Sequence, residues 1–168
     1  NKYFILITLA FAVIYTSLGL TGGSRIYYAK YVLGDEMLNS TMTMFNYIPT
    51  ILTIMLIPVF TKRFGKIKAL FVGFLFYAAG LVLEIAGPVN LPMIYTGLVL
   101  QGIGHAALYS CLFAIVGDVV DYSEWKDGIR EEGITYSVTS FGQKIGTGLG
   151  TAALGWILAA GHYDGTAA

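Results

Sequence analysis

Residues 118–150 read DVVDYSEWKDGIREEGITYSVTSFGQKIGTGLG and contain the least expected residue of the chain. Two acids, Asp118 and Asp121, stand three residues apart before a charged turn, and a largely uncharged segment follows. Lys144 lies inside that segment with no acid near it in the sequence. A charge in the middle of a membrane helix costs several kcal/mol on insertion scales and usually has a function. The reason for this lysine therefore decides most of what the sequence says about function.

The composition of the whole chain is typical of a membrane protein. Of its 168 residues, 56% are hydrophobic and 12% are charged, and the mean hydropathy is +0.69. Soluble domains carry about 25% charged residues. The 10 basic and 10 acidic residues cancel, so charge does not predict a nucleic-acid partner. The single cysteine, Cys111, excludes an intramolecular disulfide, and no His/Cys spacing predicts a metal site.

Five segments reach the roughly 20 mostly apolar residues that a membrane-spanning helix needs. They are residues 3–29, 41–61, 69–87, 92–117 and 134–160. The second contains Pro49 and Pro58, which neighbouring helices can accommodate in a membrane bundle. We therefore predict an all-α fold, a polytopic membrane helix bundle. Because the chain begins without methionine and ends soon after the last segment, we expect it to be part of a longer protein.

The basic residues predict how the bundle is oriented. If the five segments alternate in direction, seven basic residues fall on one side of the membrane, which should be the cytoplasm. They are Lys2, Lys62, Arg63, Lys66, Lys68, Lys126 and Arg130. We expect a multi-pass protein of the cell inner membrane, with Asn1 in the cytoplasm and the C-terminal end outside.

The fifth segment, if helical, has two different faces. Four hydroxyl residues fall within about 60° of Lys144 on a helical wheel; they are Ser137, Ser140, Thr147 and Thr151. On the opposite side lie Gly142, Gly146 and Gly150, a spacing of small residues that lets another helix approach closely. Lys144 is roughly 15 Å from the nearer end of the segment, too deep for its side chain to reach the surface. We predict a glycine packing face and a lysine face that looks into the bundle or onto water.

The fourth segment carries a polar stripe. Gln101, His105 and Tyr109 recur every four residues and so share one helix face. They either form hydrogen bonds to neighbouring helices or line an aqueous cavity, in which case His105 and Tyr109 are candidate substrate-binding residues. Histidine titrates near neutral pH, so a proton-linked role for His105 also stays open.

Asp118 and Asp121 end the fourth segment and oppose the dipole of its helix, which indicates cationic partners. Arg130 is the nearest candidate, and Gly128 is expected to end the helix before it. An acid/base couple of the glycosidase type is not supported, because nothing else in the sequence builds a sugar cleft. We interpret the pair as part of a gate; the alternative is a solvated helix end.

Two spaced patterns in this stretch resemble a known family. The first is D-x-x-D-Y-x-E-x-K-x-G-x-R-x-E-G at residues 118–133, and the second is S-x-x-x-F-x-x-K-x-G at residues 137–146. YYAKYVLG at residues 27–34 is also similar to that family. RFGK at residues 63–66 resembles the R-x-G-[RK] core of the cytoplasmic loop motif of the major facilitator superfamily, although the acid that normally precedes the arginine is missing. Together they resemble the glycoside–pentoside–hexuronide:cation symporters, the melibiose-permease-like members of the major facilitator superfamily. The likeness aligns the chain with helices 7–11 of twelve.

The resemblance implies sugar uptake coupled to Na⁺ or H⁺ by alternating access between two six-helix halves. It places Lys144 in the sugar and coupling region. Thr139, Ser140 and Gln143 occupy neighbouring sugar-facing positions, and Tyr109 stands where an aromatic residue contacts sugar.

The same resemblance assigns Asp118, Asp121 and Arg130 to a cytoplasmic charge network. The N-terminal half, which carries the acids for the coupling cation, and the twelfth helix are absent from this chain. No cofactor beyond that cation is implied, and the expected partners are a sugar or glycoside, the cation, the lipid bilayer and the missing half.

Two alternatives stay open beside this prediction of a partial C-terminal bundle spanning residues 1–168. One is a carrier of a different solute in the same superfamily, a lysolipid or a drug, since fold does not fix substrate. The other is a non-transporting membrane protein that assembles through its glycine face. An intramembrane enzyme is not expected, because His105 and His162 supply neither a Ser/His pair nor a histidine cluster.

Overall fold

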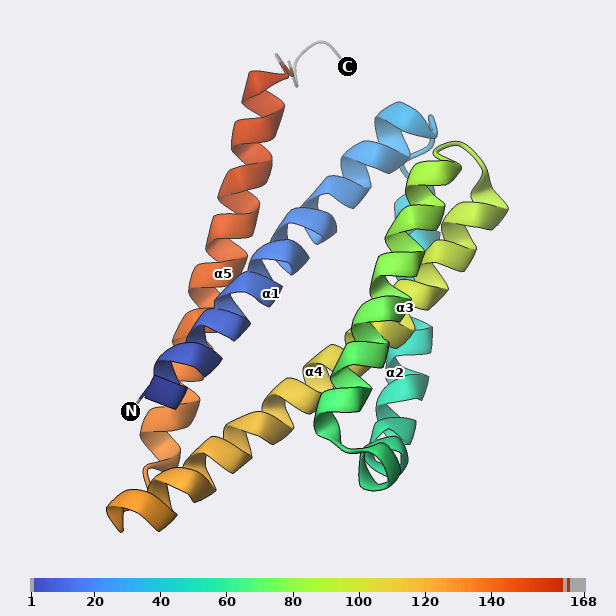
Figure 1. The fold of residues 1–168 in the computed structure, drawn as a ribbon. Coiled ribbons are helices and arrows are strands. Elements are labelled where there is room, and N and C mark those ends of the chain that lie inside the picture. The colour runs from blue at the N-terminus through green and yellow to red at the C-terminus, as the bar shows by residue number, and fades with distance from the viewer. Residues whose placement is uncertain (1, 162, 164–168) are drawn as a thin grey trace. The chain divides into compact units, whose positions relative to one another are not determined.

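The computed structural model describes residues 2–161 and 163, and every element in this part of the chain is helical. Five α-helices and one π-helical turn follow one another (Figure 1). They are α1 (Lys2–Tyr27), η1 (Tyr28–Val32), α2 (Leu38–Phe64), α3 (Lys66–Ala86), α4 (Leu91–Asp127) and α5 (Glu132–Ala160). The all-α prediction is confirmed. Asn1, His162 and the C-terminal end, for which we predicted positions or roles, lie outside the described residues.

Each predicted segment forms a helix, and the main difference is the length of α4. It continues from Gly117 through the charged residues to Asp127, and Gly128, with φ of 70°, follows it as predicted. A prediction of membrane spans stops where apolar residues stop, but the backbone hydrogen bonds of a helix do not require apolar side chains. The charged stretch is therefore an extension of α4 and not a loop.

Four helices are long and apolar enough to cross a membrane, among the residues that the structure describes. They cover Lys2–Val32, Leu38–Phe64, Lys66–Ala86 and Leu91–Lys126. The fifth predicted span, α5, has 29 residues, which at 1.5 Å per residue is about 43 Å and sufficient in length. Its glycines, hydroxyl residues and Lys144 lower its hydropathy, so composition alone does not mark it as a span.

The chain forms two compact units, one of residues 1–27 and 118–168 and the other of residues 28–117. In the first, α1 and α5 run side by side (Figure 1) and the predicted glycine face of α5 is buried between them. A Cβ atom built on Gly142, Gly146 and Gly150 would lie 2.7, 2.4 and 2.2 Å from the carbonyl oxygens of Thr8, Ala12 and Thr16. No side chain larger than hydrogen fits at these distances, so the predicted packing face is confirmed.

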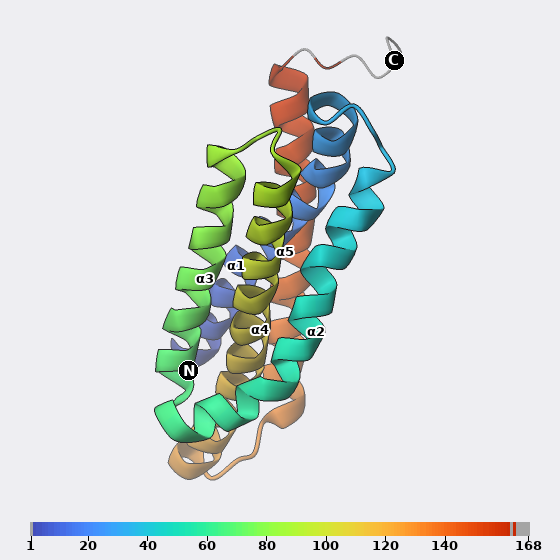
Figure 2. The ribbon, with the colours of Figure 1, turned by 90° about the vertical axis from the view of Figure 1, so that its right-hand side faces the viewer.

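The second unit groups α2, α3 and the part of α4 up to Gly117 (Figure 2), and glycines again set the contact between two of these helices. Gly80 of α3 lies against Gly97 of α4, and a Cβ on either would approach the other's carbonyl oxygen to 2.7 Å or less. Gly73 and Gly104 form a second pair, in which a Cβ on Gly104 would lie 2.6 Å from the carbonyl oxygen of Gly73 and a Cβ on Gly73 would lie 3.2 Å from that of Gly104. The glycines of the two pairs are seven residues apart on each helix, Gly73 and Gly80 on α3 and Gly97 and Gly104 on α4. We did not predict this face, although a spacing of seven residues puts two glycines on one side of a helix and was the available signal.

A layer of polar side chains lies between two apolar clusters in the second unit. One cluster consists of Ala29, Met42, Ile94 and Leu98, and the other of Ile57, Ala69, Ala107 and Cys111. Between the two clusters along α2, the side-chain amide of Asn46 donates to the backbone carbonyl of Leu98 at 3.1 Å. The hydroxyl of Thr50 donates to the backbone carbonyl of Gly102 at 3.0 Å. These bonds join α2 to α4, as polar residues commonly do between membrane helices.

The glycine contact between α1 and α5 predicts a difference between two substitutions on the same helix. Gly150→Ala should destabilise the fold by about 1–3 kcal/mol, because the new methyl group collides with backbone. Gly148→Ala is the matched control, since nothing lies within 4 Å of a Cβ there and the gain in helix propensity is the same. Thermal unfolding of both variants in detergent measures the difference. Equal melting temperatures would contradict the packing described here.

Candidate functional site

The lysine face of α5 lies opposite its glycine face and is open. Lys144 and the four hydroxyl residues predicted to surround it are all exposed, and they are Ser137, Ser140, Thr147 and Thr151. Three of these hydroxyls donate to the backbone carbonyl one turn earlier, Thr147 for example to Gln143 at 3.0 Å. Such bonds satisfy the donors and leave the oxygens available as acceptors. The two predicted faces of this helix are therefore both present.

A shallow open hollow of about 450 Å³ surrounds Lys144. It is lined by Tyr136, Ser137, Ser140, Phe141 and Lys144, all from the first half of α5. An ammonium group offers three hydrogen-bond donors, and the hydroxyl oxygens of Ser137 and Ser140 add acceptors. The two rings add apolar faces. We did not predict Tyr136 or Phe141, although their spacing from Lys144 on the helix gave the necessary signal.

Lys144 has no ion-pair partner among the described residues. Its side chain can therefore interact with an anionic or hydroxyl-bearing group without first breaking an internal bond.

Thr139 and Gln143, predicted as sugar-facing, do not line this hollow. Thr139 is 1% exposed and its hydroxyl donates to the carbonyl of Thr135 at 2.7 Å, on the buried side of α5. Gln143 is half-buried. Of the predicted binding residues on this helix, the structure brings together Lys144 and Ser140, and the role of the other two stays a prediction.

His105 and Tyr109 belong to the second unit, where they form a stack of rings with Tyr77 of α3. The ring of His105 lies 4.9 Å from that of Tyr77 and 5.5 Å from that of Tyr109, centroid to centroid, with interplanar angles of 41° and 17°. His105 is 8% exposed, whereas Tyr109 is half-buried. Gln101, one turn earlier, is 1% exposed. The polar stripe is thus mostly enclosed, and only its last residue is partly open.

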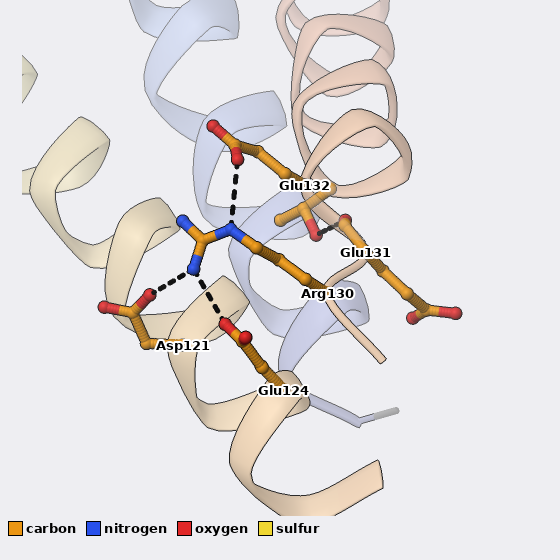
Figure 3. A network of polar contacts seen from close by, with 6 residues as sticks. Asp121, Glu124, Arg130, Glu131 and Glu132 are labelled. Atoms are coloured by element: carbon orange, nitrogen blue, oxygen red, sulfur yellow. Dashed lines mark hydrogen bonds and ion pairs between the residues drawn. The ribbon is translucent and has the colours of Figure 1, made fainter. Parts of the chain in front are cut away.

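The predicted charge network centres on Arg130, in the turn between α4 and α5 (Figure 3). Its guanidinium donates to Glu124 at 2.7 Å, to Glu132 at 3.2 Å and to Asp121 at 3.4 Å. The contacts with Glu124 and Glu132, first of all the bond to Glu124, raise the pKa of Arg130 above its ordinary value. The network joins the end of α4 to the start of α5. Asp118 lies about one turn before Asp121 on α4 and is exposed.

The predicted pairing of Asp121 with Arg130 is thus present in the structure, but the shortest contact is one we did not predict. Glu124 follows Asp121 by three residues and so shares its helix face, and this spacing was the available signal. Glu132 stands two residues after Arg130, and its contact depends on how the turn folds. Among the described residues, no group of three His, Cys, Asp or Glu side chains could hold a metal ion.

Comparison with known proteins gives the family. The family described as MFS/sugar transport protein matches residues 1–168. The chain belongs to this family. This confirms the resemblance to the glycoside–pentoside–hexuronide:cation symporters, whose curated relatives are transporters and not enzymes.

Several curated transporters are similar to the chain. The isoprimeverose transporter of Lactiplantibacillus pentosus is 34% identical over 140 residues, which are 82% of this chain and 29% of that protein. The putative sulfoquinovose importer of Salmonella typhimurium is 36% identical over 127 residues, 74% of this chain and 26% of the importer. The glucuronide carrier protein homolog of Escherichia coli is 31% identical over 142 residues, 83% and 31% of the two chains. The chain thus spans about 30% of the length of these relatives. No solved structure matches it.

The exposure of the Arg130 network predicts that it adds little to stability. Arg130→Gln should leave the melting temperature close to that of the unaltered chain, because exposed ion pairs are screened by solvent. Phe11→Ala is the contrasting variant. Its ring is fully buried against α5, and removal of such a ring costs about 3–5 kcal/mol. A loss for the arginine variant as large as for the phenylalanine variant would show that the network holds the fold.

Proposed function

We propose that the chain forms part of the C-terminal half of a sugar transporter that couples solute movement to Na⁺ or H⁺ by alternating access. The observation that carries this proposal is the open hollow around Lys144, on the face of α5 opposite its packed glycines. The names of the relatives, which include an isoprimeverose transporter and a glucuronide carrier protein homolog, support a sugar as solute. The remaining helices, the twelfth among them, come from outside this chain.

In this proposal the hollow contributes one wall of the solute site. Lys144 donates hydrogen bonds to sugar hydroxyls, Ser137 and Ser140 complete the polar contacts, and an aromatic ring stacks on the apolar face of the sugar. The acids that hold the coupling cation belong to the missing half. The electrostatic attraction between Lys144 and these carboxylates then depends on whether a cation is bound, because a bound cation neutralises part of their charge.

The Arg130 network takes the role of a cytoplasmic gate. It joins α4 to α5 at the end of the bundle that the basic residues place in the cytoplasm. Because its members are exposed, they can exchange partners with charges on the other half at a small cost in free energy. Such exchange suits the rocking of two helix bundles about a midplane site.

A second candidate solute is a small organic anion. Lys144 is an exposed cation without an ion-pair partner among the described residues, and one relative is named as a putative 2,3-dihydroxypropane-1-sulfonate exporter. A sulfonate bonded to Lys144 would use the same hollow. Competition between a glycoside and this sulfonate for the carrier separates the two solutes.

Removal of the Lys144 charge tests the proposed site. In the complete gene product, Lys144→Met should weaken uptake of labelled glycosides by roughly 10–100-fold in affinity, the usual worth of a hydrogen bond to a charged group. Lys68→Met, an exposed lysine at the start of α3, is the control and should transport normally. Solute should also protect Lys144 from an amine reagent, and uptake with and without a sodium gradient identifies the cation. Uptake unchanged in the Lys144 variant would refute the site.

The proposed orientation is tested by labelling from the two sides. In a Cys111→Ala background, Val89→Cys between α3 and α4 should react with a membrane-impermeant thiol reagent on intact cells. Lys62→Cys, near the end of α2, should react only after the membrane is opened. Both positions are exposed, so a difference reports sidedness and not burial. The reverse pattern would overturn the positive-inside assignment.

A further inference from the structure

Three aromatic rings form a stack in the second unit, in the order Tyr109, His105 and Tyr77, and Tyr77 forms its base. Tyr109 is half-buried, His105 is 8% exposed, and Tyr77 projects from α3. The planes of the two α4 rings are nearly parallel, at 17°, whereas His105 and Tyr77 are tilted by 41°. Aromatic rings at these separations attract one another beyond the contribution of buried area.

The base of the stack is fixed by backbone contacts. A Cβ atom on Gly104 would lie 2.7 Å from both the Cβ and the backbone nitrogen of Tyr77. The pair Gly73 and Ala107, about one turn away, holds the same two helices together, because a Cβ on Gly73 would lie 2.4 Å from the methyl group of Ala107. Tyr77 therefore cannot move away from α4 without separating the helices. The ring of His105 lies against that of Tyr77, and the ring of Tyr109 lies against that of His105.

Burial decides which of these rings can meet a solute. His105 offers little surface of its own, so an influence on a bound solute passes through Tyr109, its partly open neighbour on the same helix face. A tyrosine side chain in a helix has two flexible torsions, and a ring packed on one side loses most of that freedom. The stack thus orders the ring of Tyr109 before a solute arrives.

We propose that His105, supported by Tyr77, is a positioning residue that fixes the ring plane of Tyr109 and thereby sets the affinity for solute. The inference rests on the proposed transport of a sugar in so far as Tyr109 contacts it. It requires the imidazole to act as a flat ring and not through its proton. Tyr77, a residue of α3, then influences the binding of solute through its contact with the ring of His105.

The ordering of the ring at position 109 is tested without any solute. Tyr109→Trp serves as a fluorescent reporter in a chain with Trp125→Phe and Trp156→Phe, both of which are highly exposed in the native chain. The steady-state anisotropy of this reporter should fall when His105→Ala or Tyr77→Ala is added. It should be retained with His105→Phe, which keeps a flat ring. Equal anisotropy of the reporter with and without the alanine substitutions would overturn the proposal.

The effect on affinity is tested by transport in the complete gene product. His105→Ala should raise the KM for the transported glycoside about three- to tenfold, the worth of one aromatic contact, with the maximal rate within about twofold. His105→Phe should restore KM across the pH range from about 5.5 to 8, on either side of the ordinary pKa of histidine. Failure of the phenylalanine variant to restore KM, or an unchanged KM in the alanine variant, would overturn the proposal.

The anisotropy measurement and the transport measurement together distinguish a failure of this inference from a failure of the proposed function. If the unaltered protein takes up no sugar, the proposed function fails, and the anisotropy of the tryptophan reporter still decides whether His105 orders the ring. If uptake is normal but the anisotropy does not change in the alanine variants, the transport function stands and the positioning role is refuted.

Discussion

In both units, the carbonyl oxygen of one helix lies against the Cα atom of a glycine on its neighbour. Between helices in lipid there is little hydrophobic driving force, so close packing and interhelical hydrogen bonds must supply the attraction. The contact of Gly150 with Thr16 and the contact of Gly80 with Gly97 show how close the approach is. Both candidate sites follow from it. Once its glycines face α1, α5 can only direct Lys144 to the opposite side, and once Gly104 meets Tyr77, the ring of Tyr77 lies beside His105.

The first unit has two charged regions, and they differ in whether the positive charge is paired with carboxylates. At the turn between α4 and α5, one guanidinium is shared by three carboxylates that are all exposed to solvent. Glu132 lies in the first turn of α5, where the helix dipole favours an acid, whereas Asp121 and Glu124 stand near the end of α4, where it does not. Arg130 compensates for the second arrangement. About three turns along α5, Lys144 has no carboxylate partner among the described residues.

The parts of this structure that sequence could predict are those that depend on one helix at a time. Apolar length gave the five helices, and the periodicity of α5 gave its glycine face and its lysine face. The extension of α4 was missed because polar residues do not end a helix. The ring stack on Tyr77, the glycine pairs of α3 and α4, and the contacts of Arg130 with Glu124 and Glu132 depend on how neighbouring elements align, which no local pattern states. Thr139 shows the difference well. The resemblance suggested a solute-facing position, whereas the helical wheel places it about 140° from Lys144, on the side that the structure buries.

The division of α5 into two faces has an evolutionary consequence. The residues that hold it against α1 and the residues that surround Lys144 share no position, so a change on one face leaves the contacts of the other intact. Selection can therefore exchange serines, tyrosines or phenylalanines around the lysine without renewed optimisation of the packing. A family built on such a helix can diversify its solutes by small steps while its architecture is inherited unchanged.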